Sequence, residues 1–414
     1  MTDTKSLPSL EGTPITPRHA MLNRSNTWSD WMNGLTIFVR PADFGNHEAA
    51  VSAMRNRAIL EDKSPLSKYF FTGPDAAAFL QKLIIRDIST WEVGQSKYIV
   101  FCNEEGRVII DGVLFRFGED RYCYTSGPMD NWFEKHRKGF DVEIEDASAD
   151  WGNLHVQGPA AFDIIANATG QDWGDLKFGR SAQTQIAGVE VWLWRVGFGG
   201  ERGFEVWVPA EGALPVFDAL VEAGTPYGME HFGDLSEDVC RIEAGLVLPV
   251  IDYTLAGPDT PQQDVDPTGP QSVQWLATPS EIGAGRFVDF DKGEFIGRDA
   301  LMAERDGAGP RRQLVGIEVN WRDIVALQEK LDRPPRVPVR VQRFPLLELR
   351  QDGSPVGHSG SIAWSHNVNG LIGLARVSPQ AAQPGTELML AWREADQEVG
   401  EVRATTQALP FIRK

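Results

Sequence analysis

A carboxylate stands within an apolar run that follows a glycine-rich stretch. Gly197, Gly199, Gly200 and Gly203 precede Glu205, whose immediate neighbours are aromatic or aliphatic. Glycines permit a sharp backbone turn or a close approach to a ligand. Because an unpartnered charge is costly among apolar groups, this carboxylate needs hydrogen-bond donors. An arginine of the protein or the N–H-rich edge of a heterocycle such as a pterin would supply them. A β-hairpin with the carboxylate on its solvent face remains the alternative.

A second acid lies inside the strand-like run 108–115, which is apolar almost throughout. Burial would disfavour the charged form of Asp111 unless another group pairs with it. A positioned carboxyl group of this kind can move a proton during a reaction, which makes Asp111 the first catalytic candidate. The alternative is a carboxylate that bonds to turn backbone beside Gly112.

The surrounding pattern predicts short, alternating strands and helices. Between about residues 48 and 140 it predicts helices at 47–60 and 75–83, and strands at 69–72, 98–103, 108–117 and 122–126. Further along, it predicts a helix at 215–223, a long loop at 256–272, a linker at 303–313 and strands from 312 to the end. Residues 1–30 are polar with scattered prolines, and we expect them to form a tail over the body.

Composition and charge narrow the class of protein. The 414 residues suffice for two or three domains. A formal net charge of −18 argues against nucleic acid and anionic membranes as partners. Cys102, Cys123 and Cys240 are widely spaced, so neither a metal site nor a disulfide framework is expected. The chain shows no signal segment and no run long enough for a membrane helix, so we expect a cytoplasmic protein.

Several motifs in a fixed order connect this chain to a known family. They are Phe71–Leu80, Cys102–Gly112, Val156–Pro159, the glycine-rich stretch 195–209, Arg241–Gly245 and Asp291–Leu301. In this order they resemble the T-protein (aminomethyltransferase) superfamily, whose members bind tetrahydrofolate and transfer one-carbon units. The resemblance implies an α+β fold in a three-domain, cloverleaf arrangement, with a ferredoxin-like small domain and a β-rich C-terminal domain. The implied domains are a discontinuous folate-binding core at 1–47 and 140–302, the small α+β domain at 48–139 and the C-terminal domain at 312–414.

The resemblance also implies roles for individual residues. Glu205 and Arg241 match the pair that contacts the pterin of tetrahydrofolate, the expected cofactor. A plain bridge between the two side chains is the alternative. Phe198 stands where many relatives carry a tyrosine, so it is a cofactor-binding candidate that lacks the hydroxyl. Asp111 matches an aspartate beside the reactive folate nitrogen N5, whereas Ile110 replaces a second aspartate found in many relatives.

Departures from the family pattern bear on the substrate. Ser126–Pro128 replaces a folate-contacting Ser-Asn-Ala segment, and a Gly-His-Ser turn stands at 357–359. With these changes the chain resembles the aromatic O-demethylase branch, typified by vanillate and syringate demethylases. That branch carries an arginine near 126–128 that would hold a benzoate carboxylate, and this chain has none there.

The same branch resemblance singles out three aromatic residues. Tyr253 and His366 are candidates for catalytic acids, and Trp364 is a candidate for contact with the cofactor. Ordinary core or loop packing is the alternative for each of them. Methyl transfer from an aryl ether needs such an acid, because a phenolate leaves poorly unless it is protonated.

We therefore predict a tetrahydrofolate-dependent methyltransferase that moves a methyl group from a small methylated substrate, such as an aromatic methyl ether, to N5. The main alternatives are aminomethyl transfer in glycine cleavage, which would require a lipoyl carrier protein, and demethylation of a sulfonium compound or a methylamine. A more remote alternative is a non-enzymatic folate-binding helper of iron–sulfur assembly. No cysteine of this chain lies in that branch's Lys-Gly-Cys motif.

Overall fold

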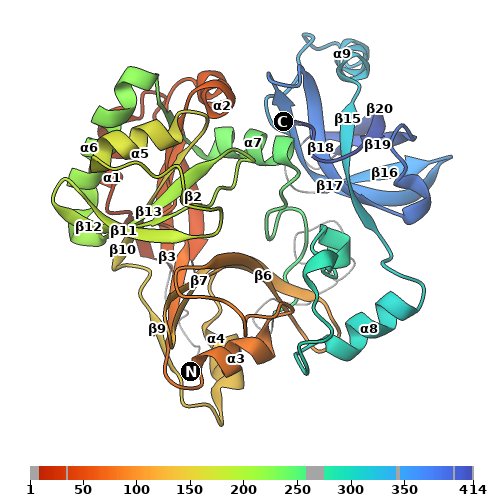
Figure 1. Cartoon of the computed structure of the whole chain (residues 1–414). Helices are drawn as coiled ribbons and strands as arrows, with labels where there is room; N and C mark the ends of the chain where they lie inside the picture. Colours follow the sequence, from red (N-terminus) through yellow and green to blue (C-terminus); the bar gives the residue numbers. More distant parts are fainter. Residues whose placement is uncertain (1–8, 34–35, 258–274, 342–345, 395–396, 413–414) are drawn as a thin grey trace, which may run out of the picture. The chain divides into compact units, whose positions relative to one another are not determined.

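The structure is a computed structural model that describes residues 9–33, 36–257, 275–341, 346–394 and 397–412 (Figure 1). It divides into two compact units. The first unit comprises Met1–Ala77, Thr90–Tyr98 and Gly112–Glu237, and the second comprises Ala78–Ser89, Ile99–Asp111 and Asp238–Lys414. The division falls inside α3 (Ala76–Leu83), β6 (Ser96–Cys102), β7 (Val108–Gly118) and α7 (Asp234–Ala244). Neither unit is therefore a continuous piece of chain.

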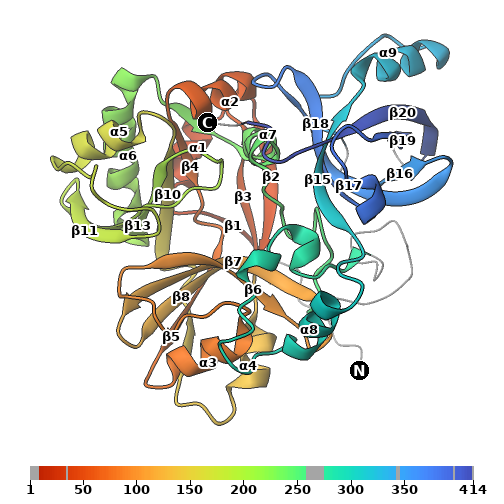
Figure 2. The same cartoon turned by 45° about the vertical axis from the view of Figure 1, so that its right-hand side comes forward.

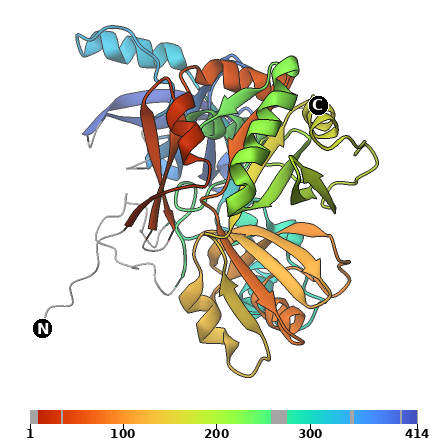
Figure 3. The ribbon, with the colours of Figure 1, turned by 90° about the vertical axis from the view of Figure 1, so that its left-hand side faces the viewer.

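The N-terminal residues form part of the first unit, so the prediction of a tail at 1–30 is wrong for the residues that the structure describes. Strands β1 (Ser9–Gly12), β2 (Thr27–Asn33) and β3 (Thr36–Asp43) form a three-stranded sheet in the order β1-β3-β2 (Figure 3, red). Helix α1 (Thr16–Leu22) lies between β1 and β2 in the chain. Ile15 is fully buried in the apolar core of this unit, which fixes the segment to the body.

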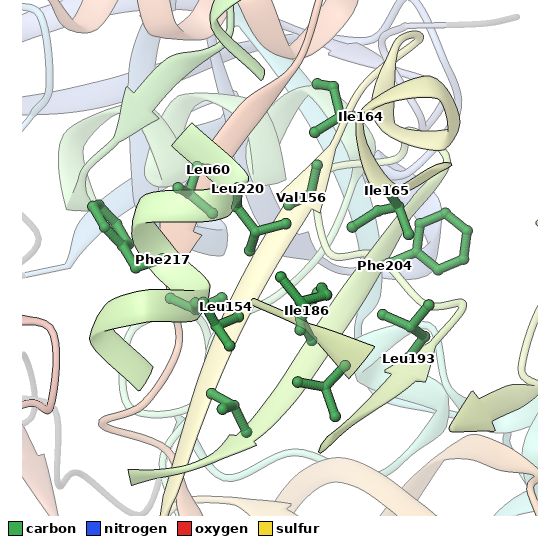
Figure 4. Close-up of a cluster of buried hydrophobic side chains, with 14 of the residues drawn as sticks. Leu60, Leu154, Val156, Ile164, Ile165, Ile186, Leu193, Phe204, Phe217 and Leu220 are labelled. Atoms are coloured by element: carbon green, nitrogen blue, oxygen red, sulfur yellow. The ribbon is translucent and has the colours of Figure 1, made fainter. Parts of the chain in front are cut away.

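A six-stranded sheet is the centre of the first unit. Its order is β11-β12-β13-β10-β4-β14, with strands β4 (Ile59–Asp62), β10 (Trp151–Gln157), β11 (Ser181–Ile186), β12 (Val189–Trp194), β13 (Gly203–Pro209) and β14 (Glu230–Phe232). Helices α5 (Ala161–Thr169) and α6 (Ala213–Gly224) supply apolar side chains to one face of this sheet (Figure 4). Leu154, Val156, Phe204 and Val206 project from β10 and β13 into that core. Residues that alternate with them must point to the opposite face.

The opposite face of the six-stranded sheet is polar. Asn153 and His155 of β10 lie opposite Trp207 and Glu205 of β13 in the antiparallel register, and His155 also lies opposite Glu61 of β4. Asn153, His155 and Glu61 are almost completely buried. We call the face formed by Glu61, Asn153, His155, Gln157, Glu205 and Trp207 the polar face. Buried polar groups need partners or a ligand, so this face is where a binding site is expected.

The small sheet has the order β6-β7-β8-β5-β9, with β5 (Ser67–Thr72), β8 (Arg121–Ser126) and β9 (Glu143–Asp146) (Figure 2). Apart from the additional strand β6, which lies between α3 and β7 in the chain and at the edge of the sheet, the chain order β5, α3, β7, β8, α4 (Asp130–Arg137), β9 and the sheet order β7-β8-β5-β9 are those of a ferredoxin-like βαββαβ unit. The predicted ferredoxin-like fold is therefore confirmed. Within the first unit, Phe133 of α4 packs edge-on against Tyr69 and Phe71 of β5.

The C-terminal part of the second unit is a closed barrel, as the prediction of a β-rich domain required (Figure 2, blue). Its strands follow the order β15-β18-β17-β16-β19-β20. Their bounds are β15 (Gln313–Val319), β16 (Leu347–Gln351), β17 (Ser354–Ser365), β18 (Gly370–Val377), β19 (Glu387–Glu394) and β20 (Gln397–Gln407), and α9 (Trp321–Lys330) follows β15. Closure removes the exposed sheet edges that invite association.

Two other local predictions need correction. The helix predicted at 47–60 ends earlier, because α2 (His47–Asn56) is followed by strand β4, which pairs with β10 and β14. The linker predicted at 303–313 begins inside α8 (Arg298–Asp306). The loop predicted at 256–272 lies almost entirely outside the described residues. The strands predicted at 69–72, 98–103, 108–117 and 122–126 and the helices predicted at 75–83 and 215–223 are confirmed with small shifts of their ends.

Candidate functional site

Glu205 is held on the polar face by two donors. The Asn153 side-chain amide donates to Oε2 at 2.9 Å, and the Trp207 indole donates to the same oxygen at 3.0 Å. Glu205 is partly exposed, and Oε1 accepts no hydrogen bond from any described residue. The sequence analysis predicted that this carboxylate would accept hydrogen bonds, and the donors come from the neighbouring strand β10 and from its own strand β13. One carboxylate oxygen remains available to a ligand.

The glycine-rich stretch between β12 and β13 folds tightly around Gln157 of the polar face. Gln157 Oε1 accepts from the backbone N–H of Gly199 at 3.0 Å, and its amide group donates to the Glu201 carbonyl at 2.6 Å. A Cβ atom on Gly197 would overlap the Gln157 amide, and one on Gly199 would lie 2.7 Å from the Met54 methyl carbon. These glycines are therefore required for close approach of the protein's own side chains.

Aromatic rings from the small sheet cover the polar face inside the first unit. The Phe115 ring centroid lies 4.8 Å from that of Trp194 and 4.8 Å from that of Trp207. In this enclosed layer three buried polar atoms lack a hydrogen-bond partner among the described residues, namely Asn153 Oδ1, His155 Nε2 and Trp194 Nε1. Such orphaned atoms are rare in folded proteins and mark places where a ligand or water binds. The layer around Glu205 has the polar groups that a heterocycle with several N–H groups and ring nitrogens requires.

Phe198 lies in the glycine-rich stretch and carries a cation above its ring. The Lys63 ammonium is 4.9 Å from the ring centroid. Lys63 itself is buried and forms ion pairs with Glu61 at 3.2 Å and with Glu237, which also pairs with Arg40. Burial lowers the pKa of Lys63, but the attraction of Glu237 and Glu61 outweighs it, so the net pKa is raised. The ring is thus held by a charged network, and its predicted contact with the cofactor remains a prediction.

Asp111 and Tyr253 form a buried pair in the second unit. The Tyr253 hydroxyl donates to Asp111 Oδ1 and accepts from the Asp111 backbone N–H at 3.2 Å. Asp111 is 7% exposed and Tyr253 is 2% exposed. The predicted pairing with turn backbone beside Gly112 is replaced by this contact with a side chain that is distant in the sequence. The structure therefore joins two of the three predicted catalytic residues.

Arg241 is fully buried in α7, where protein groups engage all its N–H donors. Nε and Nη2 donate to Asp238 at 2.9 and 2.6 Å, and Nη1 donates to Asp252 at 2.8 Å and to the Leu246 carbonyl at 3.1 Å. Nη2 also donates to the Ser361 hydroxyl of β17 at 2.6 Å. A guanidinium has five N–H groups, so a ligand would have to displace one of these partners.

The partners of Arg241 organise the turn that carries Tyr253. Asp252 Oδ2 accepts from the backbone N–H of Leu248 at 2.8 Å, and Asp252 Oδ1 accepts from Ser361 at 2.5 Å. Tyr253 follows Asp252 directly, so this network fixes the start of the Tyr253 backbone. The described partners of Glu205 all lie in the first unit and those of Arg241 in the second. Their predicted role as a pterin-binding pair remains a prediction.

Trp364 and His366 lie at the end of β17 and in the turn that follows. Their ring centroids are 6.4 Å apart in an edge-on arrangement. Trp364 packs partly against the barrel core, and His366 is exposed. Ser365, which lies between them, and Asn367, which follows His366, both donate to Glu243 of α7, at 2.6 and 2.9 Å. The predicted roles of Trp364 in cofactor binding and of His366 in catalysis remain predictions.

Sequence reasoning missed several residues that build these contacts. Asn153 and Trp207 hold Glu205, and Asp252 and Ser361 hold Arg241. Trp207 was detectable, because residues two apart on a strand share a face. Within the described ranges, no group of three or more His, Cys, Asp or Glu is placed to hold a metal ion. None of the described helices combines the length and apolar composition that crossing a membrane requires.

Comparison with known proteins places this architecture in a family. Residues 23–260 match the GCVT N-terminal domain family, and residues 312–412 match the glycine cleavage T-protein C-terminal barrel domain family. A protein of Caldanaerobacter subterraneus named aminomethyltransferase is 31% identical over 354 residues, which are 84% of each chain. The aminomethyltransferase of Streptomyces coelicolor is 30% identical over 382 residues, 90% of this chain and 91% of that protein. The chain therefore belongs to the glycine cleavage T-protein family.

A solved structure agrees with this assignment at the level of the fold. The crystal structure of the glycine cleavage system aminomethyltransferase T from Bartonella henselae superposes with a TM-score of 0.77 at 22% identity, covering 98% of each chain. The predicted T-protein-like fold is thus confirmed. The narrower prediction of the aromatic O-demethylase branch has no specific support from these relatives, whose names fit the aminomethyltransferase alternative better.

Proposed function

We propose that Glu205 binds the pteridine of tetrahydrofolate and that the Asp111–Tyr253 pair handles the proton that accompanies one-carbon transfer. The chain is an enzyme of the T-protein family, a one-carbon transferase with tetrahydrofolate as its cofactor. The observation that carries the proposed binding role is the free Oε1 of Glu205 beside orphaned polar atoms in an enclosed layer.

The residues present fit this cofactor. A carboxylate has about four lone-pair positions, and Asn153 and Trp207 occupy those of Oε2. Oε1 can therefore accept two N–H groups from one edge of a pteridine, and the unpartnered Asn153 Oδ1 offers a further acceptor. Hydrogen bonds to a charged acceptor are stronger than neutral ones, so Glu205 should dominate recognition of that edge.

The Asp111–Tyr253 pair can donate and recover a proton. The hydroxyl already points its hydrogen at the carboxylate, so the two groups share one proton within a hydrogen bond. A leaving nitrogen or oxygen must gain a proton as its bond to carbon breaks, and a positioned acid contributes typically 10²- to 10⁴-fold to such a step. Asp111 would hold the hydroxyl in place and stabilise positive charge that develops nearby.

For the transferred unit, we infer that aminomethyl transfer is the better-supported reaction. The inference follows the names of relatives at about 30% identity that span most of this chain. A lipoyl carrier protein would then be the partner that delivers the substrate. Demethylation of an aromatic ether is the second candidate. The buried tyrosine hydroxyl at Asp111 favours it, because a phenolate leaving group requires an acid.

A substrate panel distinguishes the two reactions. The protein would be incubated with tetrahydrofolate and either an aminomethyl-loaded lipoyl carrier protein or a set of methoxy-aromatic acids. The first reaction yields 5,10-methylene-tetrahydrofolate and the second yields 5-methyl-tetrahydrofolate, which chromatography separates. Product from the carrier alone supports aminomethyl transfer, and product from the ethers alone supports demethylation.

The binding role of Glu205 is tested separately by calorimetry. Glu205→Gln should raise the tetrahydrofolate Kd by about 10- to 100-fold, because it removes the charge from the acceptor of two N–H bonds. The matched control is Glu190→Gln, which alters an exposed glutamate on neighbouring β12 and should leave Kd unchanged. An unchanged Kd for the Glu205 variant would reject the proposed cofactor site.

A further inference from the structure

Lys68 of β5 is a completely buried lysine without a counter-ion in contact. Its ammonium donates to the carbonyls of Ser64 at 2.9 Å and Leu66 at 2.8 Å. Among the residues that the structure describes, no carboxylate lies within the 4.0 Å ion-pair distance of Lys68, and its third N–H has no acceptor. A buried, unpaired charge is costly, so a protein keeps one only where it has a use.

The position of Lys68 in the fold places it in the same layer as Glu205. Two residues further along β5, Phe70 shares the face of Lys68 and belongs to one buried cluster with Trp194 and Trp207. Trp207 is the residue that donates to Glu205. Burial lowers the pKa of Lys68 to about 8, and nearby acidic groups, Glu205 among them, raise it only in part. The ammonium therefore lies within electrostatic range of the Glu205 carboxylate without touching it.

We propose that Lys68 is a further cofactor-binding residue, whose third N–H donates to a ring oxygen on the same heterocycle edge that Glu205 binds. This inference rests on the proposed role of Glu205. The ligand class is a heterocycle in which adjacent N–H donors stand beside a ring carbonyl, as in the oxo form of a pteridine. The Glu205 carboxylate would accept hydrogen bonds from the N–H donors of that edge, and the Lys68 ammonium would donate one to its carbonyl oxygen. The two residues would therefore select this edge through their opposite charges.

The same features predict an unusual effect on stability. Lys68→Met removes an unpaired buried charge and keeps a side chain of similar length. If Lys68 serves only the fold, its replacement should lower the melting temperature of the protein. If Lys68 is retained for ligand binding, its replacement should raise the melting temperature and lower the affinity for the cofactor.

The experiment measures the affinities of two ligands for the full-length protein at pH 7. The ligands are folic acid and its 4-amino analogue, in which an amino group replaces the ring oxygen. The wild-type protein should prefer folic acid by at least about tenfold, the effect of one hydrogen bond from a charged donor. The analogue also lacks the ring N–H next to that oxygen, which Glu205 would bind, so Lys68→Met should reduce the preference for folic acid by about tenfold without abolishing it, and should melt at a higher temperature. Lys177→Met, on an exposed residue of the same unit, is the matched control and should preserve both values.

The outcomes separate this inference from the function on which it rests. If Glu205→Gln weakens both ligands and Lys68→Met leaves the ratio of the two affinities at its wild-type value, the cofactor site stands and the role of Lys68 is overturned. If the wild-type protein binds neither these ligands nor tetrahydrofolate, both proposals fail. Lys68→Leu is the second variant if the methionine variant does not fold, and the ratio of the two affinities applies to it unchanged because leucine has no N–H donor in its side chain. A lower melting temperature with an unchanged ratio would assign Lys68 to the fold alone.

Discussion

Replacing Arg241 by lysine tests whether its guanidinium serves the fold or the cofactor. All five of its N–H groups have partners in the second unit, and two of those partners are the buried carboxylates of Asp238 and Asp252. Breaking a buried ion pair costs about 3–5 kcal/mol. Lysine keeps the charge but loses the planar fork, so we expect Arg241→Lys to lower the free energy of unfolding by about 3 kcal/mol.

The assay is urea unfolding followed by tryptophan fluorescence, combined with tetrahydrofolate titration under native conditions. Ser361→Ala removes two bonds of the same network and should cost about 1–2 kcal/mol. Arg305→Lys is the matched control, because Arg305 pairs with Asp306 on the surface, where solvent screens the attraction, and its replacement should leave the free energy of unfolding nearly unchanged. The Kd of the folded Arg241 variant should stay within about threefold of wild type if every donor serves the protein.

The opposite pattern would refute this reasoning. A variant that unfolds at the wild-type urea concentration but binds tetrahydrofolate more than about tenfold more weakly would show that the guanidinium contacts the cofactor. The resemblance-based pairing of Arg241 with Glu205 in pterin recognition would then be correct.

Two further predictions concern the reacting pair and the response to acid. Tyr253→Phe removes the hydroxyl from Asp111 and should lower kcat by about 10²-fold with tetrahydrofolate Kd unchanged, and a wild-type kcat would exclude the hydroxyl from proton transfer. His231 stacks on Phe217 at 5.7 Å, and burial, with a smaller contribution from His19, lowers its pKa from 6.5 to about 4. Because the folded-state pKa lies below the unfolded value, this stability is complete above about pH 6.5 and is lost as the pH falls towards 4, by at most about 3 kcal/mol. His231→Phe should reduce the fall in melting temperature between pH 6.5 and 4, and identical pH profiles for the two proteins would contradict the assignment.

Local pattern was sufficient to predict most of the small sheet. The residues of β5 and β8 combine aromatic and β-branched side chains between turn residues, and their predicted positions differ from the observed ones by at most two residues. The prediction of a helix at 47–60 was wrong after Asn56, where pairing with other strands determines the structure. Ala58, Ile59 and Leu60 suit a helix or a buried strand equally, and pairing with β10 and β14 selects the strand.

The site was predictable in its acids but not in its contacts. Glu205 and Asp111 are conspicuous because each interrupts an apolar run. The partners of these acids depend on register and on segments far apart in the chain. Asn153 reaches Glu205 through the pairing of β10 with β13, and Tyr253 reaches Asp111 across 142 positions. No periodicity encodes such pairings, so the donors of Glu205 and the hydroxyl at Asp111 emerged only from the fold.

The interleaving of the two units affects the order in which this polypeptide can mature on the ribosome. Ala78–Ser89 and Ile99–Asp111 are synthesised early, yet the rest of their unit begins at Asp238. A nascent chain must therefore carry these stretches without the part of their unit that begins at Asp238 while more than a hundred later residues are translated. Incompletely packed segments of this kind are prone to aggregate, which makes them natural clients of a holding chaperone. The hydrogen bond between Tyr253 and Asp111 can form only after that interval, so this buried pair is completed late in biosynthesis.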